Sequence, residues 1–273
     1  MNFRNILNTI AETDPEVYER TSERRHVLKN MGRVATLAAL PLALGSLFKK
    51  AYGQSSSSIA EVLNFALTLE FLEAEFYKHG VDNFGAIGVP TGAPQGAITT
   101  IRNHEVAHVN FLKTAVTSLG ATPVNFTFAS FDYTANNAYT DVFTSYPTFL
   151  AVAQAFEDTG VRAYKGQAAN LMSNNDILTA ALQIHSVEAR HASHIRYMRM
   201  NGGIAQRPWI TGSQTDIPGT DAVYAGEQIT TQAGVPIIGI STNPNIDADA
   251  ASEAFDEPLN KAEVTAIITP FLA

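Results

Sequence analysis

Four segments of the chain place apolar residues at alternating spacings of three and four, which is the period of one face of an α-helix. These segments cover residues 59–77, 98–119, 150–171 and 177–198. Their length and shared period predict four long amphipathic helices that pack their apolar faces together. The sequence therefore predicts an all-α protein built around an antiparallel four-helix bundle.

The connections between the four segments differ in length. Gly80 and the Gly- and Pro-containing stretch 88–94 are expected to end the first helix and separate it from the second, and residues 173–176 form a tight turn before the fourth. Residues 122–145, by contrast, form a long polar and aromatic connection between the second and third helices. Because antiparallel neighbours need only short loops, this length predicts a crossover along the bundle.

The C-terminal part of the chain has a different pattern. Proline and glycine recur after residue 202, and no long helical period appears before residues 259–272, where a short helix is expected. We therefore predict that residues 58–202 form the bundle. Residues 203–273 are predicted to be a loop-rich extension, which either packs on the bundle or forms a subunit contact.

The N-terminal segment resembles a twin-arginine export signal. The pair Arg24 and Arg25 precedes an apolar run at residues 34–48. This run is shorter than the about 20 residues that span a bilayer, and its length is typical of a signal peptide. We predict that residues 1–53 direct export to the periplasm or the extracellular space, with no stable membrane insertion after cleavage. An uncleaved N-terminal anchor, or an arginine pair that occurs by chance, is the alternative.

Composition and charge exclude several classes of chemistry. The chain has no cysteine, which excludes disulfides, thiolate catalysis and cysteine-ligated metal sites. The net charge is −8, and without residues 1–53 it would be −11, since 10 Lys and Arg would face 21 Asp and Glu. A surface this acidic disfavours nucleic acids and anionic membranes as partners.

Charged and imidazole side chains interrupt the predicted helix seams at corresponding places. In chain order, these interruptions are Glu70, Glu105, His108, Glu157, Glu188 and His191. A buried unpaired carboxylate costs several kcal/mol, and four carboxylates in one layer repel one another. Two divalent metal ions would remove both costs, because carboxylates and neutral imidazoles suit iron and manganese. The seams therefore predict a site for two metal ions, with a polar layer satisfied by hydrogen bonds and water as the alternative.

The two halves of the bundle repeat the same layout. The single glutamates of the first and third helices are each followed seven residues later by a tyrosine, Tyr77 and Tyr164, and Glu-x-x-His recurs in the second and fourth helices. This repeat predicts a pseudo-two-fold bundle. The two tyrosines are interpreted as core aromatics with a polar tip beside the site, with a catalytic role in electron relay as the alternative.

On these motifs, the chain resembles the ferritin-like superfamily of di-metal carboxylate bundles. Within it, the chain is similar to exported ferritin-like proteins related to plant desiccation-related proteins. The stretches that carry the resemblance are 63–77, 104–112, 156–166 and 187–196. The resemblance implies a ferritin-like four-helix bundle in which Glu105 and Glu188 bridge two metals. It also implies that Glu70 and Glu157 are the single glutamate ligands of their helices and that His108 and His191 are terminal imidazole ligands.

One position departs from the superfamily pattern. Many members carry an aspartate immediately before Glu-x-x-His, where it orients a ligand histidine. This chain has His104 and Val187 there. The difference bears on redox tuning and metal preference more than on metal binding.

Several other polar residues lie close to the motifs. Glu73 is interpreted as a solvent-reaching or second-layer carboxylate, with a seventh ligand as the alternative. His185 and His194 flank the fourth-helix motif and are expected beside the ligand set or at the surface, with a ligand role as the alternative. Three acidic residues fall off the seam and are expected on a solvated face: Glu61, Glu75 and Asp158.

Three functions are compatible with these features of the sequence. The first is an exported di-metal oxidoreductase, of ferroxidase, peroxidase or catalase-like type, whose partners are metal ions and O2 or peroxide. The second is ferritin-type iron storage, although the long crossover and the extension do not suggest the compact subunit of a closed shell. The third is a non-enzymatic bundle that protects under stress such as drying. A homo-oligomer is compatible with each of them.

Overall fold

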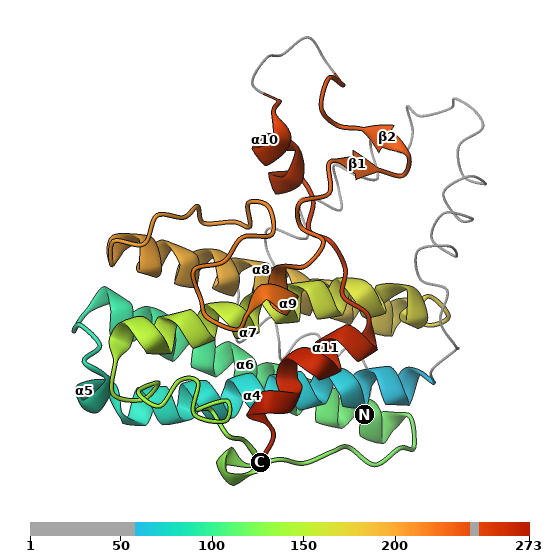
Figure 1. The fold of residues 1–273 in the computed structure, drawn as a ribbon. Helices are drawn as coiled ribbons and strands as arrows, with labels where there is room; N and C mark the ends of the chain where they lie inside the picture. The colour runs from blue at the N-terminus through green and yellow to red at the C-terminus, as the bar shows by residue number, and fades with distance from the viewer. Residues whose placement is uncertain (1–57, 241–245) are drawn as a thin grey trace. The chain divides into compact units, whose positions relative to one another are not determined.

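The computed structural model describes residues 58–240 and 246–273 (Figure 1); the predicted export signal lies outside the described residues. Four long helices form the core: α4 (Ile59–Asp82), α6 (Ala93–Ser118), α7 (Tyr146–Gln167) and α8 (Asn175–Asn201). They pack chiefly as two pairs, α4 with α6 and α7 with α8. The predicted four-helix bundle is confirmed. Within the described ranges, no helix combines the length and apolarity needed to cross a membrane.

Side-chain caps explain where several helices begin. The Ser58 hydroxyl accepts from the Glu61 amide, and the Glu61 carboxylate accepts from the Ser58 amide, so α4 starts with a capping box. The Asn174 side chain accepts from the first amides of α8, as the tight turn predicts. The short α5 (Phe84–Ile87) and Gly88, whose φ is 78°, complete the connection from α4 to α6.

Gly80 does not end the first helix, contrary to the sequence-based expectation. It lies inside α4 and is buried. A Cβ at this position would lie 2.6 Å from the ring of Phe149, near the start of α7. The glycine therefore serves close packing between α4 and α7, and α4 continues to its cap at Asn83.

The connection between α6 and α7 runs along α4. The Val124 amide donates to the Asn64 side chain at 2.9 Å, near the start of α4. Further along, the Tyr133 hydroxyl donates to the Leu72 carbonyl at 2.8 Å. The connection also includes the short 3-10 helix η1 (Phe128–Ser130), which packs on α4. The predicted crossover between the second and third bundle helices is therefore confirmed.

The C-terminal extension consists of short elements joined by loops. They are α9 (Asp221–Tyr224), β1 (Thr231–Gln232), β2 (Val235–Pro236), α10 (Ala248–Glu253), α11 (Lys261–Ile268) and η3 (Thr269–Phe271). The two strands pair antiparallel, with Thr231 opposite Pro236. Helices α9 and α11 pack on α7, whereas β1, β2 and α10 extend away from the bundle (Figure 1).

Two residues of α7 hold the extension in place. The buried Arg162 guanidinium pairs with the Glu227 carboxylate at 2.8 Å and also donates to backbone carbonyls of the extension. One turn later, Gly166 allows a very close approach, because a Cβ there would lie 1.9 Å from the Leu259 carbonyl oxygen. The extension therefore packs on the bundle, which is one of the two arrangements expected from the sequence.

Candidate metal centre

The six polar residues predicted on the helix seams meet in one buried layer. The four glutamates are 0% exposed, and both histidines are buried. Each residue continues the apolar seam of its helix; on α6, for example, Glu105 and His108 lie between the buried Ile101 and Leu112. Packing of the apolar seams therefore forces the polar residues toward a common space.

The layer consists of two overlapping groups of four side chains. One group is Glu70, Glu105, His108 and Glu188, and the other is Glu105, Glu157, Glu188 and His191. Within each group, one candidate ligand atom from each residue lies within 4.8 Å of all the others. Glu105 and Glu188 belong to both groups, so the two groups share two carboxylates.

The two shared carboxylates each face both histidines. Glu105 Oε2 lies 3.3 Å from His108 Nδ1, and Glu105 Oε1 lies 2.8 Å from His191 Nδ1. Glu188 Oε1 lies 3.1 Å from His108 Nδ1, and Glu188 Oε2 lies 3.8 Å from His191 Nδ1. The two oxygens of each shared carboxylate therefore lie nearest to different histidines.

The two unshared glutamates are each oriented by a tyrosine from the opposite helix. The Tyr77 hydroxyl donates to Glu157 Oε1 at 2.6 Å, and the Tyr164 hydroxyl donates to Glu70 Oε1. The other oxygen, Oε2, lies 3.1 Å from the histidine Nδ1 of its own group for Glu70 and 3.3 Å for Glu157. The predicted pseudo-two-fold relation therefore extends to the tyrosines.

Several buried atoms of this layer make no hydrogen bond of acceptable geometry with the described residues, although oppositely charged groups lie at ion-pair distance from them. They are Glu105 Oε1, Glu157 Oε2, Glu188 Oε1 and Oε2, and His191 Nδ1. An unsatisfied buried polar atom costs about 1–3 kcal/mol, and more when it is charged. Carboxylate oxygens and imidazole nitrogens directed at one space are also the donor set of divalent first-row metals. The residues therefore fit bound metal ions.

When no metal is bound, burial and charge in the layer favour the protonated forms of several of its side chains. Burial raises the pKa of Glu70 well above its usual value and that of Glu157 to about 8. Burial lowers the pKa of both histidines, but nearby carboxylates outweigh it and hold each pKa well above 6.5. For Glu105, burial raises the pKa, but the charges and hydrogen bonds of His108 and His191 together outweigh burial and hold the pKa well below its usual value. Metal binding at neutral pH must therefore displace protons.

Glu73 is buried beside this layer and does not reach solvent, contrary to one sequence-based interpretation. It belongs to neither group of four. A Cβ at Gly160 would lie 3.3 Å from Glu73 Oε1 and 3.6 Å from Glu188 Oε2. Gly160 therefore leaves room for both carboxyl groups, and burial together with the neighbouring carboxylates raises the pKa of Glu73 well above its usual value.

The expectation for Asp158 is wrong. It is buried, accepts from Arg196 Nη2 at 2.6 Å and from the Tyr224 hydroxyl at 2.8 Å. Its position off the seam indicated a solvated face, but the extension covers that face. Glu61 is exposed, as expected, and Glu75 pairs with Lys78.

Three histidines that are close in sequence to the Glu-x-x-His motifs lie outside the two groups. His185 contacts the Val161 carbonyl through Nδ1 at 3.0 Å, and His194 packs near the Tyr197 ring. His104 has a different place, because its Nδ1 lies 2.9 Å from Nε2 of His191. The sequence reasoning did not assign this contact, although the position of His104 directly before Glu-x-x-His was the signal for it.

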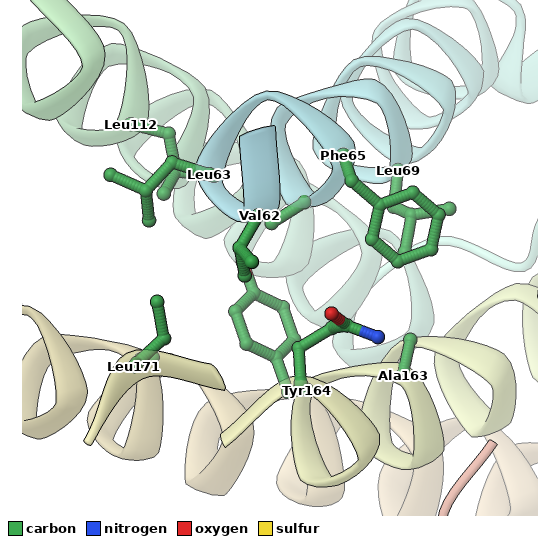
Figure 2. A pocket seen from close by; sticks show the side chains of 11 residues that line it. Val62, Leu63, Phe65, Leu69, Leu112, Ala163, Tyr164 and Leu171 are labelled. Carbon is green, nitrogen blue, oxygen red and sulfur yellow. The ribbon is translucent and has the colours of Figure 1, made fainter. Parts of the chain in front are cut away.

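A small apolar cavity lies next to the layer, further along the same seam. Its volume is about 20 Å³, and all four bundle helices contribute to its wall. Figure 2 shows Tyr164 projecting from α7 toward Val62 on α4. The ring of Tyr164 forms part of the wall while its hydroxyl donates to Glu70. One side chain therefore separates an apolar space from the candidate metal ligands.

Comparison with known proteins bears on the same part of the chain. A family model described as a ferritin-like domain matches residues 58–201. The matched range contains the four bundle helices and every residue of the buried layer. A search of curated proteins found no match.

Proposed function

Since the chain belongs to the ferritin-like domain family, we propose that its buried layer binds two divalent metal ions, iron or manganese, for redox chemistry. The observation that carries the proposal is the pair of overlapping ligand groups that share Glu105 and Glu188. A single cation position would not account for carboxylates whose two oxygens face different histidines. Four carboxylates also balance the charge of two divalent ions.

In this proposal, each metal position has its own residues. Glu70 and His108 would hold one ion, Glu157 and His191 the other, and the two shared glutamates would lie between them. When bound, such a metal pair supplies a two-electron redox centre that can act on dioxygen, peroxide or further metal ions. The protein buries this centre among apolar residues and thereby excludes bulk water from it.

The tyrosines have a defined part in this arrangement. Burial raises the pKa of Tyr77 and Tyr164 well above 10, so both remain phenols that donate at neutral pH. Each holds its proton against Oε1 of a glutamate and leaves Oε2 to face the centre. They therefore orient the two unshared glutamates before metal binds.

Export by the twin-arginine route belongs to the same proposal. Its support is the sequence of residues 1–53, with Arg24 and Arg25 before an apolar run. The route carries folded proteins, which suits a protein that takes up its metal in the cytoplasm before export to the periplasm or beyond.

The protein is expected to bind two metal ions and to gain thermal stability from them, more at pH 8 than at pH 5.5. Glu70, Glu157 and both histidines have folded-state pKa values above their unfolded values. Between pH 5 and 8 the metal-free folded state therefore binds more protons than the unfolded state, and its stability falls as pH rises. Metal displaces these protons, so metal affinity rises over the same interval.

Elemental analysis and thermal unfolding with metal or chelator measure both effects. Two metal ions per chain, and a melting temperature that a chelator lowers more at pH 8 than at pH 5.5, would support the proposal. A melting temperature that metal and chelator leave unchanged at both pH values would contradict it.

The metal-loaded protein is also expected to oxidise Fe²⁺ in air or to decompose hydrogen peroxide faster than protein-free solution does. Stopped-flow absorbance and oxygen evolution measure these two activities. Background rates with two metal ions bound would contradict the redox part of the proposal while leaving metal binding intact. Gel filtration separates the storage alternative, because a shell of a dozen or more subunits would favour storage.

A further inference from the structure

The two histidines of the buried layer differ in what their outer ring atoms contact. His191 presents Nδ1 to the carboxylates, and its Nε2 lies 2.9 Å from Nδ1 of His104. The rings of His104 and His191 are nearly parallel, at 14°, with centroids 5.2 Å apart. His108 makes its polar contacts with the described residues through Nδ1, and its side chain is 11% exposed against 5% for His191.

This difference has a simple origin in the sequence. His104 directly precedes Glu105 on α6, and its counterpart in the other half of the bundle, Val187, directly precedes Glu188 on α8. Both positions are partly buried. Val187 is the equivalent of His104 under the pseudo-two-fold relation, and valine has no hydrogen-bonding group to offer to His108. The difference between the two halves of the layer therefore arises at one pair of equivalent positions, His104 and Val187.

The contact with His104 affects how His191 can bind a cation. A proton on His191 Nε2 can be donated to His104 Nδ1, which leaves the lone pair of His191 Nδ1 directed at the carboxylates. Such a contact holds the ring orientation and makes the ligand nitrogen more basic. Loss of an outer contact of this kind typically costs 10- to 100-fold in metal affinity.

We propose that His104 is a positioning residue for His191 and that it makes the two metal positions unequal. The position of Glu157 and His191 fills first, and the position of Glu70 and His108 fills second. This inference rests on the proposed dinuclear centre. It adds to that centre an order of filling, whose cause is one side chain outside the ligand set.

The test is a titration of the metal-free full chain with Mn²⁺, followed by calorimetry and by electron paramagnetic resonance. The wild-type protein is expected to show two steps separated by about 10-fold or more in affinity. At one equivalent, its spectrum should be mainly that of isolated Mn²⁺, and a spin-coupled pair should appear only with the second equivalent. Equal positions would instead give a mixture from the start.

Three variants test whether the contact between His104 and His191 causes this inequality. His104→Val makes both positions valine and is expected to weaken the first step by about 10- to 100-fold, which merges the two steps. Val187→His offers His108 the same kind of partner and is expected to strengthen the second step. His104→Asn keeps a polar group at the place of Nδ1 and should preserve the order of filling, which a purely steric role would not predict.

The outcomes separate this inference from the proposed function. Two equal steps in the wild-type protein, or His104→Val weakening both steps equally or neither, would overturn the role of His104 while the dinuclear centre stands. No Mn²⁺ binding by the wild-type protein would overturn the centre and this inference with it. Circular dichroism of each variant checks its fold, and if His104→Val does not fold, His104→Asn and Val187→His still decide the result.

Discussion

Replacement of both Glu105 and Glu188 with glutamine is expected to abolish binding of the metal pair while leaving the bundle folded. Each group of four would lose both of its shared carboxylates, and with them the negative charge between the two positions. We expect metal affinity to fall by far more than 100-fold, because the remaining ligands per position are one carboxylate and one imidazole. Calorimetry with Fe²⁺ or Mn²⁺ would measure the loss.

The same variant shows separately how the buried layer affects stability and whether it binds metal. Glutamine has nearly the shape of glutamate, but it cannot balance the charge of the buried histidines, and removal of one partner of a buried ion pair is destabilising. The metal-free variant should therefore unfold at or below the temperature of the metal-free wild type, and metal should no longer change that temperature. Glu75→Gln is the control, because Glu75 pairs with Lys78 outside the layer and its loss should leave binding intact. Two metal ions bound to the double variant would contradict the assignment.

Replacement of Asp158 with alanine is expected to lower the free energy of unfolding by about 3–5 kcal/mol, the largest stability effect of a single substitution described here. The change leaves the buried Arg196 guanidinium without its partner at 2.6 Å. It also removes the acceptor of the Tyr224 hydroxyl. Urea denaturation in the presence of a chelator would measure the effect without a contribution from metal.

Two further variants test whether burial of the Asp158–Arg196 pair causes this loss of stability. Arg207→Ala breaks the Arg207–Glu253 pair, whose arginine side chain is 55% exposed, and should cost less than about 1 kcal/mol. The double variant Asp158→Leu with Arg196→Met replaces the buried pair by apolar groups and should recover most of the loss. A loss below about 1 kcal/mol for Asp158→Ala would contradict the account of a buried, interdependent pair.

The bundle and the meeting of its six polar residues could be predicted because the relevant information is local and periodic. The spacing that places Ile101 and Leu112 on the seam of α6 also places Glu105 and His108 there. Four such seams in one chain leave few ways to bury their apolar faces other than against one another. The length of the crossover followed from the same reasoning about short connections.

The unpredicted contacts join parts of the chain that have no common period. Asp158 lies off the seam, and only Tyr224 and the remainder of the extension make its environment buried. Gly80 shows the same difficulty on a smaller scale, because a glycine near a helix end indicates a break until the ring of Phe149 is known to lie against it. In both cases a residue far along the sequence decides the role of the nearer one.

The burial of α7 on all sides has a consequence for quaternary structure. From Phe149 to Gln167 no residue is exposed, because one face lines the core and the extension covers the other. The C-terminal extension therefore occupies the face of α7 that a second subunit could otherwise contact. Copies of the protein therefore cannot dock through the outer face of α7. An interface would have to form elsewhere, for instance on α8, where Leu182 and Tyr197 are 46% and 51% exposed.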